Sequence, residues 1–210
     1  MSRKKFSILN VPNMSLMAVE ELEKIYELLR KHQATLTTIT PGQRLAVYGM
    51  SAEKLRALQD ELSANFPVDE GIKVTSLQSC PGLEQCRYAV ADSLMLGRKI
   101  DRLTFDRPFP HKVKIGIAAC KMCCTKPYIR DVGILAGRKA WSVLFGGNAG
   151  GRPRIGDLLA SELQEDEVVA LVKRSLDFYI ENAAKKQRTA RFIEQIGVDK
   201  FRKAVLDFKG

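Results

Sequence analysis

The chain has 210 residues, of which 45% are hydrophobic, and this composition excludes wholesale disorder. No stretch approaches the roughly 18 to 20 consecutive apolar residues of a membrane span. The basic amino-terminal segment has too short and too interrupted an apolar part for a signal peptide. We therefore expect a cytoplasmic protein that does not bind membranes. The net charge of +10 indicates an anionic partner, although a solvated basic surface accounts for the same charge.

The first 70 residues predict a small α+β unit. Alternation of apolar and polar residues indicates short strands, and helical spacing of leucines indicates two helices. In chain order, the expected elements are a strand at 5–11, a helix from Ser15 to about Lys31, strands at 34–40 and 43–49 joined by the turn Pro41-Gly42, and a helix from Ser51 to about Asn65. We place a domain boundary after residue 70.

The remaining region, residues 71–210, predicts a second α+β unit. Cys86, Val90, Leu94 and Gly97 fall on one face of a helix expected from Leu83, so Cys86 is expected to point inward. Pro127 bars a helix through the later cysteines. The other expected elements are strands at 72–80 and 111–120, a hairpin at 130–147, a Gly-rich basic loop at 146–154, and helices at 154–163, 166–183 and 188–208.

Five cysteines stand in two groups, with Cys80 and Cys86 in the first and Cys120, Cys123 and Cys124 in the second. Zinc ligands usually stand about two to four residues apart, so the spacing of the first pair fits zinc poorly, although Cys120 and Cys123 keep zinc open as an alternative. A cytosolic chain makes a disulfide framework less favoured still. Four thiolates from two loops suit a 4Fe–4S cluster, which takes one thiolate per iron.

The sequence around these cysteines resembles that of the sirohaem-dependent sulfite and nitrite reductase family. The matching stretches are CPGLEQCRYAVADS, HKVKIGIAACKMCCTKPYIRDVGILAG and FGGNAGGRPRIGDLL, and residues 36–50 resemble the ferredoxin-like half-domain of that family. By size, the chain resembles the small single-module assimilatory-type sulfite reductases of anaerobes. The resemblance implies an α+β protein with a ferredoxin-like half-domain at 1–70 and an α+β sirohaem and 4Fe–4S domain at 71–210.

In that family the last cysteine bridges one cluster iron to the sirohaem iron, and the resemblance gives this role to Cys124. Cys80, Cys86 and Cys120 are then expected to hold the other three irons. Cys123 departs from the family pattern. Three interpretations of Cys123 are open: a spare buried thiol, the true bridging ligand in a shifted register, or a redox-active thiol beside the cofactor.

Sirohaem is a polycarboxylate, and burying it requires cations and backbone N–H groups. The Gly-rich loop offers two arginines and an amide, and its glycines allow close approach of the backbone; the alternative is a plain hairpin exit with surface arginines. The predicted cofactor-binding residues are Arg44, Arg87, Asn148, Gly150, Arg152 and Arg154, with an ordinary salt bridge as the alternative for Arg44 and Arg87.

Lys112 and Lys114 alternate on the strand expected to lead to Cys120, so both are expected to face the same side. In the family, a pair of this kind points at the substrate oxyanion. The resemblance therefore predicts that both lysines attract the substrate and favour proton delivery, and that the adjacent His111 relays protons.

The predicted function is reduction of sulfite to sulfide with six electrons from an external donor such as a ferredoxin, because no flavin or nicotinamide fingerprint is present. The alternatives are reduction of nitrite to ammonia at the same site, or a redox module without turnover, since larger family members have two related halves and this chain has one. A nucleic-acid-binding module has only the net charge in its favour, so we expect no nucleic acid partner. The expected state is a monomer or a homodimer.

Overall fold

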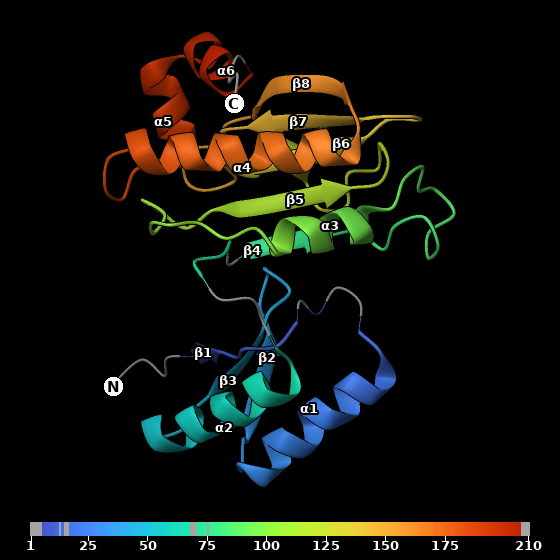
Figure 1. Cartoon of the computed structure of the whole chain (residues 1–210), viewed down its shortest axis with the longest axis vertical. Coiled ribbons are helices and arrows are strands. Elements are labelled where there is room, and N and C mark those ends of the chain that lie inside the picture. The colour runs from blue at the N-terminus through green and yellow to red at the C-terminus, as the bar shows by residue number, and fades with distance from the viewer. Residues whose placement is uncertain (1–5, 13, 15–16, 68–70, 75, 207–210) are drawn as a thin grey trace. The chain divides into compact units, whose positions relative to one another are not determined.

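A three-stranded antiparallel sheet and two helices make up the first of two compact units, residues 1–70 and 71–210, in the computed structural model (Figure 1). The structure describes residues 6–12, 14, 17–67, 71–74 and 76–206. The elements of the first unit are β1 (Phe6–Ile8), α1 (Val19–Lys31), β2 (Leu36–Ile39), β3 (Leu45–Tyr48) and α2 (Ala52–Asn65), with the strands in the order β1-β3-β2. Its core is built from buried residues of both helices and of β3, among them Ile25, Val47 and Leu58.

The predicted helix from Ser51 is confirmed as α2, and the Ser51 hydroxyl accepts the N–H of Lys54 at 3.3 Å. The other helix begins later than predicted. The expected cap Ser15 lies outside the described residues, and α1 begins at Val19, where the Glu21 carboxylate accepts the N–H of Ala18 at 2.9 Å. The carboxylate reaching back to this N–H sets the start of the helix.

A five-stranded sheet forms the centre of the second unit (Figure 1). Its five strands stand in chain order. The first three run parallel to one another, the fourth runs antiparallel to the third, and the fifth runs antiparallel to the fourth. They are β4 (Ser76–Ser79), β5 (Lys114–Ala118), β6 (Val132–Ala136), β7 (Trp141–Phe145) and β8 (Asp157–Leu163). Because β4 and β5 are parallel neighbours, the segments that follow them emerge at the same end of the sheet.

Two helices, α3 (Ser93–Asp101) and α4 (Glu165–Asn182), cover one face of this sheet (Figure 1). Leu96 and Ile100 of α3 and a buried stripe on α4 pack on the sheet residues Ile115 and Ile117. The short helices α5 (Thr189–Ile196) and α6 (Val198–Leu206) follow and add Phe192 and Phe201 to the core. None of the described helices has both the length and the apolar character of a membrane span.

Residues 119–131 join β5 to β6 and cross the other face of the sheet. We call this segment the crossover. Its single turn of 3₁₀ helix, η1 (Pro127–Ile129), begins at the proline that was predicted to bar an α-helix. Gly116 and Gly133 are register partners on the face away from Ile115 and Ile117. A Cβ on Gly133 would lie 2.1 Å from the Pro127 carbonyl oxygen, so the crossover rests directly on the backbone of the sheet.

Three predicted helices of the second unit differ from the structure. The helix expected from Leu83 begins only at Ser93, because the Asp92 carboxylate caps it by accepting the N–H groups of Leu94 and Met95, each at 3.0 Å. Cys86 therefore lies in a turn and not on the inner face of a helix. The expected helix at 154–163 is wrong, since residues 157–163 pair with β7 as strand β8. The helix at 188–208 is broken at Gly197, whose φ is +83°.

Candidate cluster site

Two cysteines follow adjacent parallel strands and lie at the same end of the sheet. Cys80 comes directly after β4, and its N–H donates to the carbonyl of Ile117 at 3.1 Å. Cys120 stands two residues after β5. The N–H of Ala119 donates to the Cys80 sulfur at 3.1 Å, so that sulfur lies against the residue that precedes Cys120.

Donor groups surround the sulfur of Cys80, which is only 8% exposed. Besides the N–H of Ala119, the buried Ser93 hydroxyl lies 3.1 Å from this sulfur and donates to the Cys80 carbonyl at 2.9 Å. Hydrogen bonds to the ligand sulfurs are among the features with which proteins tune an iron–sulfur cluster. The environment of Cys80 is therefore suited to a metal-bound thiolate.

Cys86 reaches the same region through the loop at 81–92. The loop turns at Gly82, whose φ is +79°. The N–H of Ala89 donates to the Cys86 carbonyl at 3.0 Å, and the N–H of Val90 donates to the Ala119 carbonyl at 2.9 Å. These bonds tie the turn that carries Cys86 to the end of β5.

The remaining cysteines form two consecutive turns at the start of the crossover. The N–H of Cys123 donates to the Cys120 carbonyl at 3.2 Å, and the N–H of Lys126 donates to the Cys123 carbonyl at 2.7 Å. Cys123 has a left-handed backbone with φ of +52°. Burial, and then the charges of Cys120 and Cys124, raise the pKa of the Cys123 thiol. Cys124 is exposed.

The four predicted ligands, which are all of the cysteines except Cys123, fit an iron–sulfur cluster in donor type and number. Among the residues that the structure describes, no three His, Cys, Asp or Glu side chains form a group that could hold a metal ion. A 4Fe–4S cluster places each thiolate on a different iron, so its ligands stand around the cluster instead of converging on one point. Cys80, Cys86, Cys120 and Cys124 would hold such a cluster, with Cys124 as the exposed ligand.

The Gly-rich loop joins β7 to β8 at the opposite end of the sheet from the cysteines, because β7 runs antiparallel to β6. Asn148 shapes this loop: its Nδ2 donates to the Arg152 carbonyl at 2.7 Å, and its Oδ1 accepts the N–H of Gly150 at 3.2 Å. A Cβ on Gly147 would lie 2.3 Å from the Arg130 carbonyl oxygen, so the loop also meets the end of the crossover.

The two arginines of this loop differ in their surroundings. Arg154 donates to the Gly146 carbonyl at 3.0 Å and to the Asp157 carboxylate at 2.5 Å, and its side chain is 19% exposed. Arg152 is 75% exposed and lies 3.2 Å from Glu194. Arg154 thus clamps the hairpin, whereas Arg152 is accessible to an anionic ligand.

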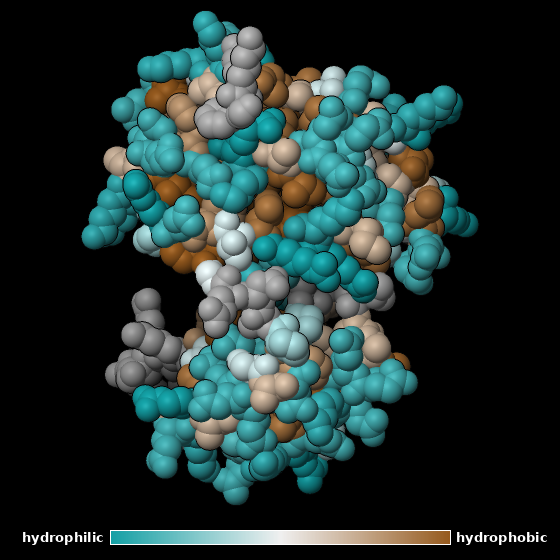
Figure 2. All heavy atoms as spheres, in the orientation of Figure 1, coloured by the Kyte–Doolittle hydropathy of each residue, from teal (hydrophilic) through white to brown (hydrophobic). Residues whose placement is uncertain are grey.

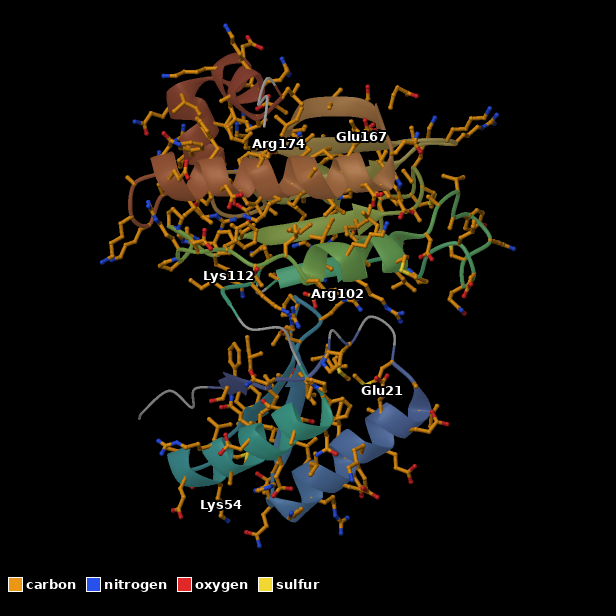
Figure 3. The ribbon with its side chains drawn as sticks, in the orientation of Figure 1. Glu21, Lys54, Arg102, Lys112, Glu167 and Arg174 are labelled. Carbon is orange, nitrogen blue, oxygen red and sulfur yellow. The ribbon has the colours of Figure 1, made fainter. Side chains whose placement is uncertain are left out.

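His111, Lys112 and Lys114 lie at the amino end of β5, whereas Cys120 follows its carboxyl end (Figure 3, where Lys112 is labelled). The strand begins at Lys114, and Lys112 precedes it. Burial alternates along this segment, since Val113 and Ile115 are buried whereas Lys112 and Lys114 are not. His111 Nδ1 lies 3.4 Å from the Lys112 carbonyl oxygen. The described contacts do not bring these three residues to the cysteines.

The two other predicted basic residues belong to different units. Arg44 belongs to the first unit, at the turn before β3, where its N–H donates to the Thr40 hydroxyl at 3.2 Å. Arg87 lies in the Cys86 loop, where its guanidinium stands 4.7 Å from the ring centre of Tyr88 and donates to the Tyr88 hydroxyl at 2.5 Å.

Sequence reasoning missed Arg130, which lies closer to the cysteines than Arg152 and Arg154 of the Gly-rich loop do. Its Nε donates to the Thr125 carbonyl at 3.0 Å, next to Cys124, and its Nη2 donates to Gln78 of β4. Burial lowers the pKa of Arg130, and the neighbouring Asp131 opposes that shift. Only its position in the cysteine-bearing crossover could have singled it out.

Comparison with known proteins places this site in a family. A model of the nitrite and sulphite reductase 4Fe-4S domain matches residues 70–209. The assimilatory-type sulfite reductase of Nitratidesulfovibrio vulgaris is 38% identical over 208 residues, which are 98% of this chain and 95% of that protein. The large subunit of the Escherichia coli NADH nitrite reductase is 32% identical over 199 residues, but this chain spans only 23% of its length.

Solved structures show the same fold at low sequence identity. Dissimilatory sulfite reductase I superimposes with a TM-score of 0.79 at 15% identity, over 95% of this chain and 68% of that one. The NirA protein of Mycobacterium tuberculosis gives a TM-score of 0.69 at 19% identity, over 91% of this chain and 38% of that one.

These findings confirm the predicted α+β fold class, the predicted reductase class of enzyme, and the predicted cofactors of the family, a 4Fe–4S cluster and sirohaem. The chain belongs to the nitrite and sulphite reductase 4Fe-4S family.

Proposed function

We propose that this protein reduces sulfite to sulfide with six electrons from an external donor. The observation that carries the proposal is the placement of Cys80 and Cys120 at one end of two parallel strands, with the Ala119 N–H directed at the Cys80 sulfur. The similarity of this chain to an assimilatory-type sulfite reductase, over 95% of that protein's length, supports sulfite as the substrate.

The reaction balances as hydrogen sulfite plus six electrons and six protons, giving hydrogen sulfide anion and three waters. When bound, the cofactors would carry the donor's electrons to the substrate and would supply the iron to which it binds. Cys80, Cys86, Cys120 and Cys124 would hold the cluster, with Cys124 proposed as the ligand shared with sirohaem. The half-buried Arg130 and the exposed Arg152 are positioned to offset anionic charge.

His111, Lys112 and Lys114 remain proposed substrate contacts that rest on the family resemblance. Similarly, Arg44, Arg87, Asn148, Gly150 and Arg154 remain proposed sirohaem contacts. Because Arg154 is 19% exposed and pairs with Asp157, whereas Arg152 is 75% exposed, we rank Arg154 below Arg152 as a ligand for a cofactor carboxylate.

Nitrite is the second candidate substrate. Nitrite takes six electrons and eight protons to give ammonium and two waters, and it needs the same kind of cationic site. The identity of 32% to the Escherichia coli NADH nitrite reductase large subunit supports it, although this chain spans less than a quarter of that protein.

Anaerobic purification, followed by iron and sulfide analysis and an absorption spectrum, tests the cofactors. Turnover with reduced methyl viologen then compares sulfite with nitrite. We expect sirohaem and cluster bands and a higher kcat/KM for sulfite. A higher kcat/KM for nitrite would reverse the choice of substrate. Cofactor-replete protein that turns over neither anion is a redox module, and protein that stays colourless after reconstitution contradicts the proposal altogether.

A further inference from the structure

A pocket of about 320 Å³ opens beside Cys120 at the cysteine end of the second unit. Three loops form its walls. Tyr88 and Val90 come from the Cys86 loop, Cys120 and Met122 come from the start of the crossover, and Gly137 belongs to the turn between β6 and β7. A predicted cluster ligand is therefore a wall of a surface pocket.

The rim of this pocket carries exposed apolar side chains beside the cations Lys121 and Arg138. Met122 is 68% exposed, Tyr88 54% and Val90 42%, and Leu83 on the same loop is also exposed. Isolated exposed apolar residues are common, but these four, three of which line one pocket, lie on two adjoining loops and form a patch. In Figure 2 hydrophobic and hydrophilic side chains are interspersed at this end of the unit, toward which β5 points.

Exposed cations stand among these apolar residues. The three loops carry one exposed carboxylate, Glu84, and five exposed cations, which are Arg87, Lys121, Lys126, Arg138 and Lys139. None of the five forms an ion pair within the part of the chain that the structure describes. Arg87 is a proposed sirohaem contact, so we call the other four cations and the four apolar residues the cysteine-end surface. At the opposite end of the sheet, by contrast, Arg152, Arg154 and Arg191 all meet Glu194.

We propose that the cysteine-end surface docks a small acidic electron-transfer protein that supplies the electrons, an inference that rests on the proposed function. An apolar centre with charges around it is the usual anatomy of a protein interface. Unpaired cations steer an anionic partner to its site and set its orientation. Cys120 at the pocket wall gives the electron a short path to the cluster. Each docked donor is oxidised by one electron, so six successive encounters complete one turnover and no bond forms between the proteins.

The test compares two charge-reversal double variants of the holoenzyme. Arg138→Glu with Lys139→Glu changes the turn between β6 and β7, outside the cysteine-bearing segments. Lys185→Glu with Lys200→Glu is the matched control, since both residues are exposed and lie near the other end of the unit. The probe is a small acidic bacterial ferredoxin. Its KM is measured in the reduced form at low and high salt, and its Kd is measured in the oxidised form by surface plasmon resonance.

We expect the Arg138/Lys139 reversal to raise both the KM and the Kd for ferredoxin about tenfold at low salt and to flatten their salt dependence. Turnover with methyl viologen and sirohaem content should not change, and the control should behave as wild type. Unchanged ferredoxin binding in the Arg138/Lys139 variant overturns the proposal. Loss of sirohaem from that variant also overturns it, because the cations would then bind cofactor carboxylates.

Failure of the proposed function gives a different result. Wild-type holoenzyme would then not turn over sulfite or nitrite even with methyl viologen, while the Kd for oxidised ferredoxin would still report on the surface. A functional enzyme without a docking surface would turn over with methyl viologen and show no salt-dependent binding of ferredoxin.

Discussion

A single buried carboxylate, that of Asp131, joins three segments of the second unit. It is 1% exposed and accepts the N–H of Lys114 at 2.9 Å, a guanidinium nitrogen of Arg188 at 2.9 Å and the hydroxyl of Thr189. The start of β5, the end of the crossover and the start of α5 are thereby held together. A carboxylate with three donors is well compensated, whereas its removal leaves Arg188 without its partner.

We expect Asp131→Ala to lower the free energy of unfolding by about 3 kcal/mol, because breaking a buried ion pair leaves the remaining charge without its partner. Denaturant unfolding measures this. Asp177→Ala is the control, since Asp177 pairs with Lys173 on the more exposed side of α4, and it should cost less than about 1 kcal/mol. Equal losses in the two variants would show that Asp131 is not the link we describe.

The two adjacent thiols of the crossover are expected to differ in function. Cys124→Ser should uncouple the cluster from sirohaem, because it removes the proposed shared ligand, whereas Cys123→Ser should leave the coupling intact. Electron paramagnetic resonance of the oxidised and reduced forms measures the coupling. If only Cys123→Ser removed it, the shifted register would be correct.

At the scale of elements, the crossover depends on two facing glycines in β5 and β6. A Cβ on Gly116 would lie 2.8 Å from the Thr125 carbonyl oxygen, and one on Gly133 would lie 2.1 Å from that of Pro127. The obstructing atoms are backbone, so they cannot rotate away as a flexible side chain can. The path of the segment that carries Cys123 and Cys124 is therefore fixed by the sheet beneath it.

Gly133→Ala should lower the free energy of unfolding by about 2 kcal/mol or more, as overpacking does in a close contact. Gly151→Ala is a matched control, because its Cβ would meet no atom within 4 Å, and it should change stability by less than about 0.5 kcal/mol. Cluster content, from iron and sulfide analysis, should fall in the first variant and not in the second. Equal stability of the two would contradict the close approach.

Local signals predicted some elements and could not predict others. The start of α2 could be predicted from Ser51, because a helix cap acts within its own turn. The cap Asp92 also acts locally, but the apolar spacing from Cys86 to Gly97 masked it and suggested a longer helix. Strand β8 depends on pairing with β7, and the contact of Arg130 with Gln78 joins residues far apart in sequence. No local pattern reports such contacts.

At the scale of the whole molecule, all four predicted cluster ligands belong to residues 71–210, which have their own hydrophobic core. A fragment of these residues should therefore fold and take up a 4Fe–4S cluster after reconstitution. Circular dichroism and iron analysis of the fragment, beside the full chain, measure this. A fragment that folds but binds no iron would show that the first unit is required for the cluster.

The contact between the crossover and the sheet has a consequence for the speed of electron transfer. Each electron that enters a metal centre changes its preferred bond lengths, and the ligands must adjust before the electron can move on. Because Thr125 rests on Gly116, the backbone directly after Cys123 and Cys124 is held against the sheet. A cluster ligand held on this support, as proposed for Cys124, would adjust little, which would keep the reorganisation energy of electron transfer through the cluster small.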